Sequence, residues 1–279
     1  ALAQGGWAGV QRRYDQPRRN HCWVFRVSEM RHRHCTDTRM VETLNRGKLG
    51  SLEDPVNKHD TPAALAAGIA AGIFADTGRL DQQEIDRLGA ECVALTHGHP
   101  LAFLPGAMVA HLIGGCLRQP PKPLYTLIKE ALGAMQAQFV REYPREVGHI
   151  TALVEQAMTL AEERLVQPFD AMERLKCDTG AEVLAGAVYA ALLCEEDFDN
   201  AMVVAVNHSG RSAAVAALTG AILGAQLGEE ILPDFYLDGL FIVDVLRELA
   251  DDLVQGCPMV RGSLLFDGDW ESKYLHGEY

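Results

Sequence analysis

The sequence DNAMVVAVNHSGRS at residues 199–212 runs on into AAVAALTGAILGA at residues 213–225. Its first part has apolar residues at helical spacing and ends in Asn-His-Ser-Gly, a group typical of a turn or a helix cap. The second part is small and apolar, with glycines at positions 220, 224 and 228. Glycines four residues apart leave a bare helix face, which favours close packing of another helix. The stretch therefore predicts two buried helices, joined by a polar loop at the centre of the molecule.

The stretch resembles the ADP-ribosylglycohydrolase family, including the dinitrogenase reductase-activating type, in which this segment reads roughly NHSGDSDSTGAIAGNILGA. Three further motifs occur in the family's order: LTHGHP at residues 95–100, LPDF at 232–235 and LADDL at 249–253. The resemblance covers about residues 34–255 and implies an all-α fold, formed by a single compact multi-helix domain. It leaves residues 1–33 as a divergent basic N-terminal segment and 256–279 as a C-terminal tail beside the domain.

The resemblance also implies a site for ADP-ribose or a related nucleotide. The residues at the matching motifs are predicted to bind this substrate; they are His97, His99, Asn207, His208, Ser209, Gly210 and Arg211. Family members hold Mg²⁺ or Mn²⁺ with a Thr-Asp-Asp-Thr box and with two aspartates after Asn-His-Ser-Gly. Of the first box only Thr36 and Asp37 remain here, as a remnant of the metal site. The family's two aspartates are replaced by Arg211 and Ala213.

Two functions remain open. The chain is predicted to be an ADP-ribosylglycohydrolase-family protein with an eroded metal site, impaired in catalysis but keeping the fold and an ADP-ribose-like ligand cleft. In this case no cofactor is expected, and no catalytic residue is nominated. The alternative is an active metal-assisted hydrolase that uses Mg²⁺ or Mn²⁺ to remove ADP-ribose from a protein or small-molecule acceptor. A hard dication depends on the number and charge of its oxygen ligands, so the lost acids favour the first function.

Several motifs have a structural interpretation beside the functional one. Asp37 is placed to cap the helix that follows it, and the His-Gly-His-Pro run fits a helix end followed by a helix start. Arg211 has three alternatives: it reaches solvent, it pairs with Asp37 or Glu182 as an internal cation, or it binds the phosphates of a nucleotide. Pairing with a buried acid would make its removal destabilising by roughly 1–3 kcal/mol.

Composition and charge limit the class of protein. A net charge of −13 argues against a partner nucleic acid, although residues 1–40 hold eight arginines and only three acids. The seven cysteines are widely spaced without a Cys-x-x-Cys pair, which predicts reduced thiols and a cytoplasmic protein. No apolar run is long enough to cross a membrane.

Helix signals occur along most of the chain. Asp81 with Glu84 forms a capping-box pattern, and Asp178-Thr179 with Glu182 marks another helix start. Further helices are predicted over residues 63–74, 105–117, 123–139, 145–166 and 238–254. No stretch shows the sustained alternation of a β-strand.

Overall fold

The structure is a computed structural model that describes residues 37–46, 48–75, 80–255 and 268. These residues form α-helices and two short 3-10 helices, and the described ranges contain no strand, so the predicted all-α fold is confirmed. The chain forms two compact units: residues 1–49 with 235–279, and residues 50–234. The domain boundaries predicted near residues 33 and 255 adjoin or lie in ranges that the structure does not describe, and they stay predictions.

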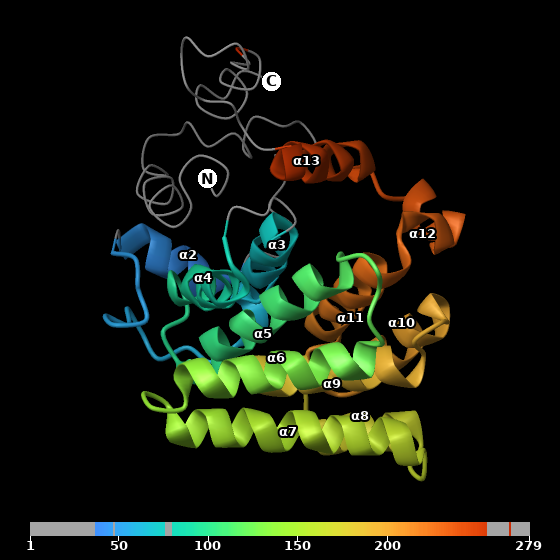
Figure 1. The fold of residues 1–279 in the computed structure, drawn as a ribbon, viewed down its shortest axis with the longest axis horizontal. Helices are drawn as coiled ribbons and strands as arrows, with labels where there is room; N and C mark the ends of the chain where they lie inside the picture. Colours follow the sequence, from blue (N-terminus) through green and yellow to red (C-terminus); the bar gives the residue numbers. More distant parts are fainter. Residues whose placement is uncertain (1–36, 47, 76–79, 256–267, 269–279) are drawn as a thin grey trace. The chain divides into compact units, whose positions relative to one another are not determined.

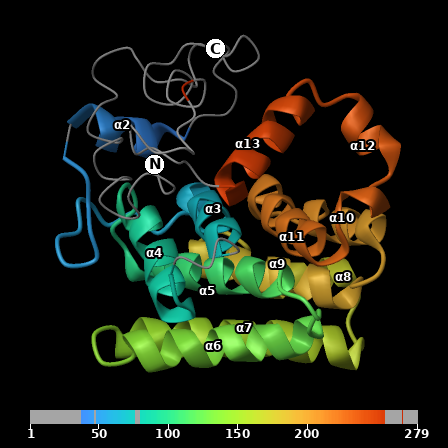
Figure 2. The ribbon, with the colours of Figure 1, turned by 45° about the horizontal axis from the view of Figure 1, so that its top comes forward.

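The unit of residues 50–234 contains most of the helices (Figure 1). They are η5 (Pro62–Ala64), α3 (Ala66–Phe74), α4 (Gln82–Ala94), α5 (Pro100–Cys116), α6 (Leu124–Phe139), α7 (Pro144–Glu163), α8 (Pro168–Leu175), α9 (Gly180–Leu193), α10 (Phe198–Val206), α11 (Ser212–Leu227) and η7 (Glu229–Ile231). Helices α6 and α7 lie side by side along one edge of the unit in both ribbon views (Figures 1 and 2).

Helices α5 and α9 are the buried centre of this unit. All residues of α5 from 102 to 116 are buried, as is α9 from 183 to 191. Both helices are apolar around their whole circumference, a pattern that requires neighbours on every side. Helices α3, α4, α6, α9 and α11 pack against α5, which lies among them in Figures 1 and 2.

The prediction that residues 199–228 form the buried centre was wrong. Val203 and Val206 of α10 are 50% and 47% exposed, and Asn207, Ser209 and Arg211 in the following loop are exposed. Helix α11 buries one face, whereas α5 and α9 bury all sides. The apolar runs were correctly read as helical, but their periodicity did not indicate which helix is enclosed.

The glycines of α11 do not provide a close helix contact. Among the described residues, a Cβ atom at Gly224, or at Gly228 just after the helix, would meet no atom of another segment within 4 Å, and at Gly220 it would lie 3.8 Å from Met202. Close contacts occur instead where α4 crosses α5. There a Cβ atom at Gly89 would lie 2.5 Å from the carbonyl oxygen of Gly106. Helix α3 also approaches α5 closely, since a Cβ atom at Gly72 would lie 2.6 Å from the Cβ of Ile113. The close helix contacts are therefore those of α3 and α4 with α5.

Helix α5 begins at Pro100, not at Pro105 as predicted, and contains Pro105 in its interior. Because proline lacks an N–H, the carbonyl group of Leu101 loses the donor that would normally lie four residues later. Pro105 is buried, and the packing around α5 outweighs this local cost. The start of α9 lies against the carbonyl of Leu101, since a Cβ atom at Gly180 would be 2.7 Å from its oxygen.

Two other helices differ from prediction. Helix α7 ends at Glu163, because Arg164 adopts a left-handed conformation with φ of 52°. Helix α8 was not predicted; it starts with Pro168 and has only 8 residues, which is too short for a periodic signal. The capping box predicted at Asp81 and Glu84 is confirmed. The helix start predicted at residues 178–182 is confirmed too, and in the structure Thr179 and Glu182 form a capping box there.

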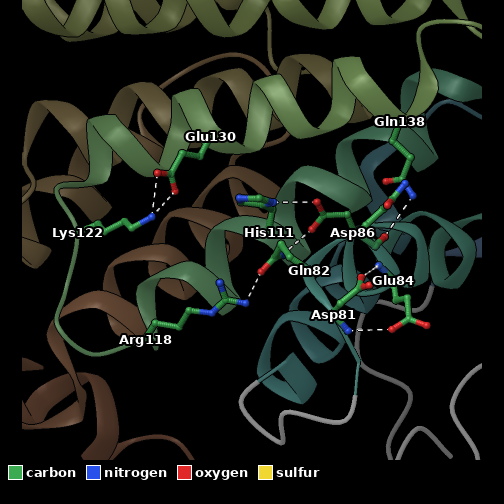
Figure 3. A network of polar contacts seen from close by, with 10 residues as sticks. Asp81, Gln82, Glu84, Asp86, His111, Arg118, Lys122, Glu130 and Gln138 are labelled. Atoms are coloured by element: carbon green, nitrogen blue, oxygen red, sulfur yellow. Dashed lines mark hydrogen bonds and ion pairs between the residues drawn. The ribbon is translucent and has the colours of Figure 1, made fainter.

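A buried acid and histidine join α4 to α5 (Figure 3). The Nδ1 atom of His111 lies 2.8 Å from Oδ2 of Asp86, whose side chain is 2% exposed. The Nε2 atom of Gln82 donates to Oδ1 of Asp86 at 2.6 Å, and Arg118 donates in turn to the Oε1 atom of Gln82. Both carboxylate oxygens of Asp86 thus have a hydrogen-bond partner, as burial of a charged group requires.

The other unit contains α2 (Thr38–Arg46) and α13 (Val243–Gln255), and α12 (Asp234–Asp238) begins at the last residue of the larger unit. The helix predicted over 238–254 begins later, because Gly239 follows α12 and separates it from α13. In the described part of the chain, no helix combines the length and apolar character needed to span a membrane.

Candidate functional site

Thr36 and Asp37 form the predicted remnant of the metal site. Thr36 lies outside the described residues. Asp37 precedes α2 and accepts a hydrogen bond from the backbone N–H of Met40 at Oδ1, at 2.9 Å. It therefore caps the helix, as one of its two interpretations predicted. Its role as a metal ligand stays a prediction.

The seven residues predicted to bind substrate all lie in the unit of residues 50–234. They lie in two loops, residues 96–100 and 207–211. Two further loops, residues 57–61 and 176–180, are hydrogen-bonded to these, and each of the four loops leads into an α-helix or a 3-10 helix. We call these four loops the loop cluster.

The first two loops are joined by the side chain of Asn57. Its Nδ2 donates to the carbonyl oxygen of Thr96 at 2.7 Å, and its Oδ1 accepts from the N–H of Gly98 at 2.9 Å. The backbone of Gly98 approaches closely, since a Cβ atom there would lie 2.5 Å from the carbonyl oxygen of Asn57. This explains the glycine of the His-Gly-His run without any ligand.

His97 is fully buried, and both of its ring nitrogens are hydrogen-bonded. Nε2 lies 3.1 Å from the hydroxyl of Thr61, and Nδ1 lies 3.0 Å from the hydroxyl of Thr96. The ring therefore joins the first loop to the second. Its predicted contact with a substrate stays a prediction.

His99 is the N-cap of α5. Its Nδ1 accepts a hydrogen bond from the backbone N–H of Leu101 at 3.1 Å. In the neutral ring the proton must then be on Nε2, which makes this nitrogen a donor. His99 is partly exposed, whereas His97 is buried, so the ring of His99 is the more accessible of the two.

The third loop is connected to the first through the start of α9. The N–H of Gly180 donates to the carbonyl oxygen of Asp60 at 2.7 Å. Thr179 caps the helix, and Oε2 of Glu182 accepts from the N–H groups of Asp178 and Thr179 at 3.1 Å and 3.0 Å. One carboxylate oxygen of Glu182 is thus engaged in capping α9.

The fourth loop is held by its own hydrogen bonds and by α8. Nδ1 of His208 accepts from the N–H of Gly210 at 3.0 Å, and its Nε2 lies 3.0 Å from the carbonyl oxygen of Ala205. The N–H of Ser209 donates to Oε1 of Glu173 at 2.6 Å, and this hydrogen bond lowers the pKa of the Glu173 carboxyl. Asn207 donates from Nδ2 to the carbonyl of Val203 at 2.7 Å.

Arg211 joins the fourth loop to the third. Its backbone N–H donates to the carbonyl of Cys177 at 2.8 Å, and its Nε donates to both the carbonyl oxygen and Oδ1 of Asp178, at 3.0 Å and 2.8 Å. Pairing was one of the three alternatives for this residue, but the partner is Asp178 and not Asp37 or Glu182. The side chains of Arg211 and Asp178 are 43% and 69% exposed.

The sequence did not predict the strained backbone at Lys176 and Cys177, which positions Asp178 beside Arg211. Lys176 and Cys177 have φ angles of 62° and 55°, a region that residues other than glycine rarely adopt. Gly210 fits against them, since a Cβ atom there would lie 2.4 Å from the carbonyl oxygen of Lys176. No glycine or asparagine marks positions 176 and 177, so the sequence carried no signal for this turn.

Exposure of the pair limits its expected contribution to stability. We expect Arg211→Ala to lower the free energy of unfolding by about 0–1 kcal/mol, because exposed ion pairs are screened by solvent. This is less than the loss expected for a buried partner. Urea unfolding would measure it, and a loss above about 2 kcal/mol would show that the pair is structurally more important than its exposure indicates.

The side chains of the fourth loop do not suit a divalent cation. Mg²⁺ and Mn²⁺ prefer several oxygen ligands, with carboxylates among them. Position 211 supplies a guanidinium, which is itself a cation, and Ala213 supplies no ligand. Among the described residues, no three His, Cys, Asp or Glu side chains are grouped so that they could hold a metal ion.

The fold and the loop cluster define an all-helical protein whose polar loops meet beside the first turns of α5, α9 and α11. The sequence profile of the ADP-ribosylglycohydrolase family matches residues 4–262, and the chain belongs to this family. A comparison with curated proteins found no match.

Proposed function

We propose that this chain binds ADP-ribose or a related nucleotide at the loop cluster and is impaired in glycosidic hydrolysis. The observation that carries the proposal is the pair between Arg211 and Asp178. In the family, the residue at position 211 is an aspartate that binds metal. Here the positively charged guanidinium of Arg211 takes its place in the fourth loop. Family membership supports the nucleotide as the ligand class.

The remaining acids near the loops support impaired hydrolysis. Asp178 is paired with Arg211, Glu182 caps α9 and Glu173 accepts from the N–H of Ser209. Each of these carboxylates already has a partner in the protein. A hydrolase needs a carboxylate or a bound metal ion that can activate water, and each of these three acids already uses one of its two carboxylate oxygens in a structural hydrogen bond.

An active metal-assisted hydrolase is the second candidate. It is favoured by Asp37, which is kept at the start of α2 with one carboxylate oxygen used in capping. An acid at a helix start can bind a cation with its other oxygen. This candidate requires Mg²⁺ or Mn²⁺, which the first does not.

One experiment separates the two candidates. ADP-ribose would be titrated into the full chain by calorimetry, first with EDTA and then with millimolar Mg²⁺ or Mn²⁺, and release of ADP-ribose from an ADP-ribosylated peptide would be assayed under both conditions. We expect binding that EDTA does not weaken, and no release above the rate without protein. Metal-dependent release that is lost in Asp37→Ala would establish the hydrolase. Absence of binding under all conditions would refute the nucleotide site.

A further inference from the structure

We infer that Arg211 contacts a phosphate group of the ligand directly, through the outer edge of its guanidinium, so that ligand affinity depends on this arginine and not on a metal ion. The inference rests on the proposed function, and it adds the residue and the chemical group that it recognises.

The guanidinium is held by one edge only. The Nε donor is used twice, toward the carbonyl oxygen and Oδ1 of Asp178. The two Nη atoms carry four more N–H donors, and within the described chain no residue accepts a hydrogen bond from them. Asp178 therefore orients the guanidinium and leaves its two Nη atoms available to donate to a ligand.

The backbone beneath the arginine is also fixed. The N–H of Arg211 is bonded to Cys177, and Gly210 lies in close contact with the carbonyl oxygens of Lys176 and Cys177. The N–H of Ser209 is held by Glu173. A donor that is already ordered loses less conformational freedom when a ligand binds, so the same contact contributes more to affinity.

The chemistry of the free edge selects the ligand group. Two parallel N–H donors on a planar cation match two oxygens of a phosphate or a carboxylate. Asp178 neutralises part of the charge of Arg211, so a group with more than one negative charge gains most from the contact. The diphosphate of an ADP-ribose-class ligand meets this condition. A polyanion such as nucleic acid is disfavoured by the net charge of −13.

The test compares four proteins: the unaltered full chain, Arg211→Ala, Arg211→Lys and Arg145→Ala. Arg145 is an exposed arginine of α7, so its variant reproduces the change in net charge away from the loop cluster. The Kd for ADP-ribose would be measured in EDTA for each, with inorganic pyrophosphate as a competitor. Circular dichroism would confirm that the variants are folded, as the exposure of the pair leads us to expect.

We expect Arg211→Ala to raise the Kd about ten- to hundredfold, which corresponds to the loss of one charge-assisted contact. Arg145→Ala should leave it unchanged. Arg211→Lys keeps the charge but not the planar pair of donors, so it should recover only part of the affinity. Pyrophosphate should displace ADP-ribose from the unaltered chain.

A Kd that changes by less than about threefold in Arg211→Ala would overturn the inference and leave the proposed function standing. Full recovery by Arg211→Lys would overturn the two-pronged contact, and so would failure of pyrophosphate to compete. If the unaltered chain does not bind ADP-ribose, both the inference and the proposed function fail.

Discussion

Replacing Gly89 by alanine is expected to lower the free energy of unfolding by about 3 kcal/mol or more. A Cβ atom at this position would lie 2.5 Å from the carbonyl oxygen of Gly106 and 2.6 Å from the Cβ of Ala110. These are backbone or near-backbone atoms of α5, which is buried on all sides. No side-chain rotation relieves the clash, so α4 and α5 would have to separate and lose packing along their whole contact.

The matched control is Gly148→Ala in α7. Within the part of the chain that the structure describes, a Cβ atom at Gly148 would meet no atom of another segment within 4 Å, and the position is exposed in a regular helix. Alanine is favoured over glycine there by about 0.5–1 kcal/mol, so this variant should be more stable than the unaltered chain. Urea unfolding followed by circular dichroism would measure both variants. Equal effects in the two would contradict the close crossing of α4 and α5.

The second large effect is expected at the buried pair of His111 and Asp86. His111→Leu keeps a similar side-chain volume but leaves Asp86 with Gln82 as its only described partner. Removing one member of a buried pair leaves the other incompletely compensated, which costs about 3–5 kcal/mol. The same unfolding experiment would detect this loss.

Two controls distinguish the buried charge from a general packing defect. In the double variant His111→Leu with Asp86→Leu, both polar groups are removed, and we expect it to be more stable than His111→Leu alone. Lys122→Ala breaks the exposed pair with Glu130 and should cost at most about 1 kcal/mol. If His111→Leu costs no more than Lys122→Ala, the buried pair is not important for stability.

Local signals in the sequence were sufficient to predict most of the helices and several helix starts. The helix starts at Asp81 and Thr179 depend on residues within one turn. Such features form through hydrogen bonds between residues close in the sequence, so they can be predicted from the local sequence alone. The family resemblance supplied the order of motifs, and the profile match confirmed the family.

The features that were missed depend on residues far apart in the chain. The partner of Arg211 is Asp178, and periodicity says nothing about which of several acids it reaches. The left-handed Lys176 and Cys177 fit against Gly210 only after α8, α9 and α11 have packed. Likewise, α5 and α11 are similar apolar runs, and only tertiary packing determines that α5 is enclosed and α11 is partly exposed.

The hydrogen bonds of the loop cluster also bear on the order in which the chain folds. Helices α3, α4 and α5 are consecutive and pack on one another, so their contacts close short loops at a small entropic cost. The contact of Gly180 with Asp60 instead joins segments separated by most of the larger unit, and it requires α5 and α9 to be in place. The three consecutive helices should therefore form early and the loop cluster last. A population of partly folded chains would then retain much of its helix content while the loop cluster is not ordered, so binding at the proposed nucleotide site would report completion of the fold better than helicity does.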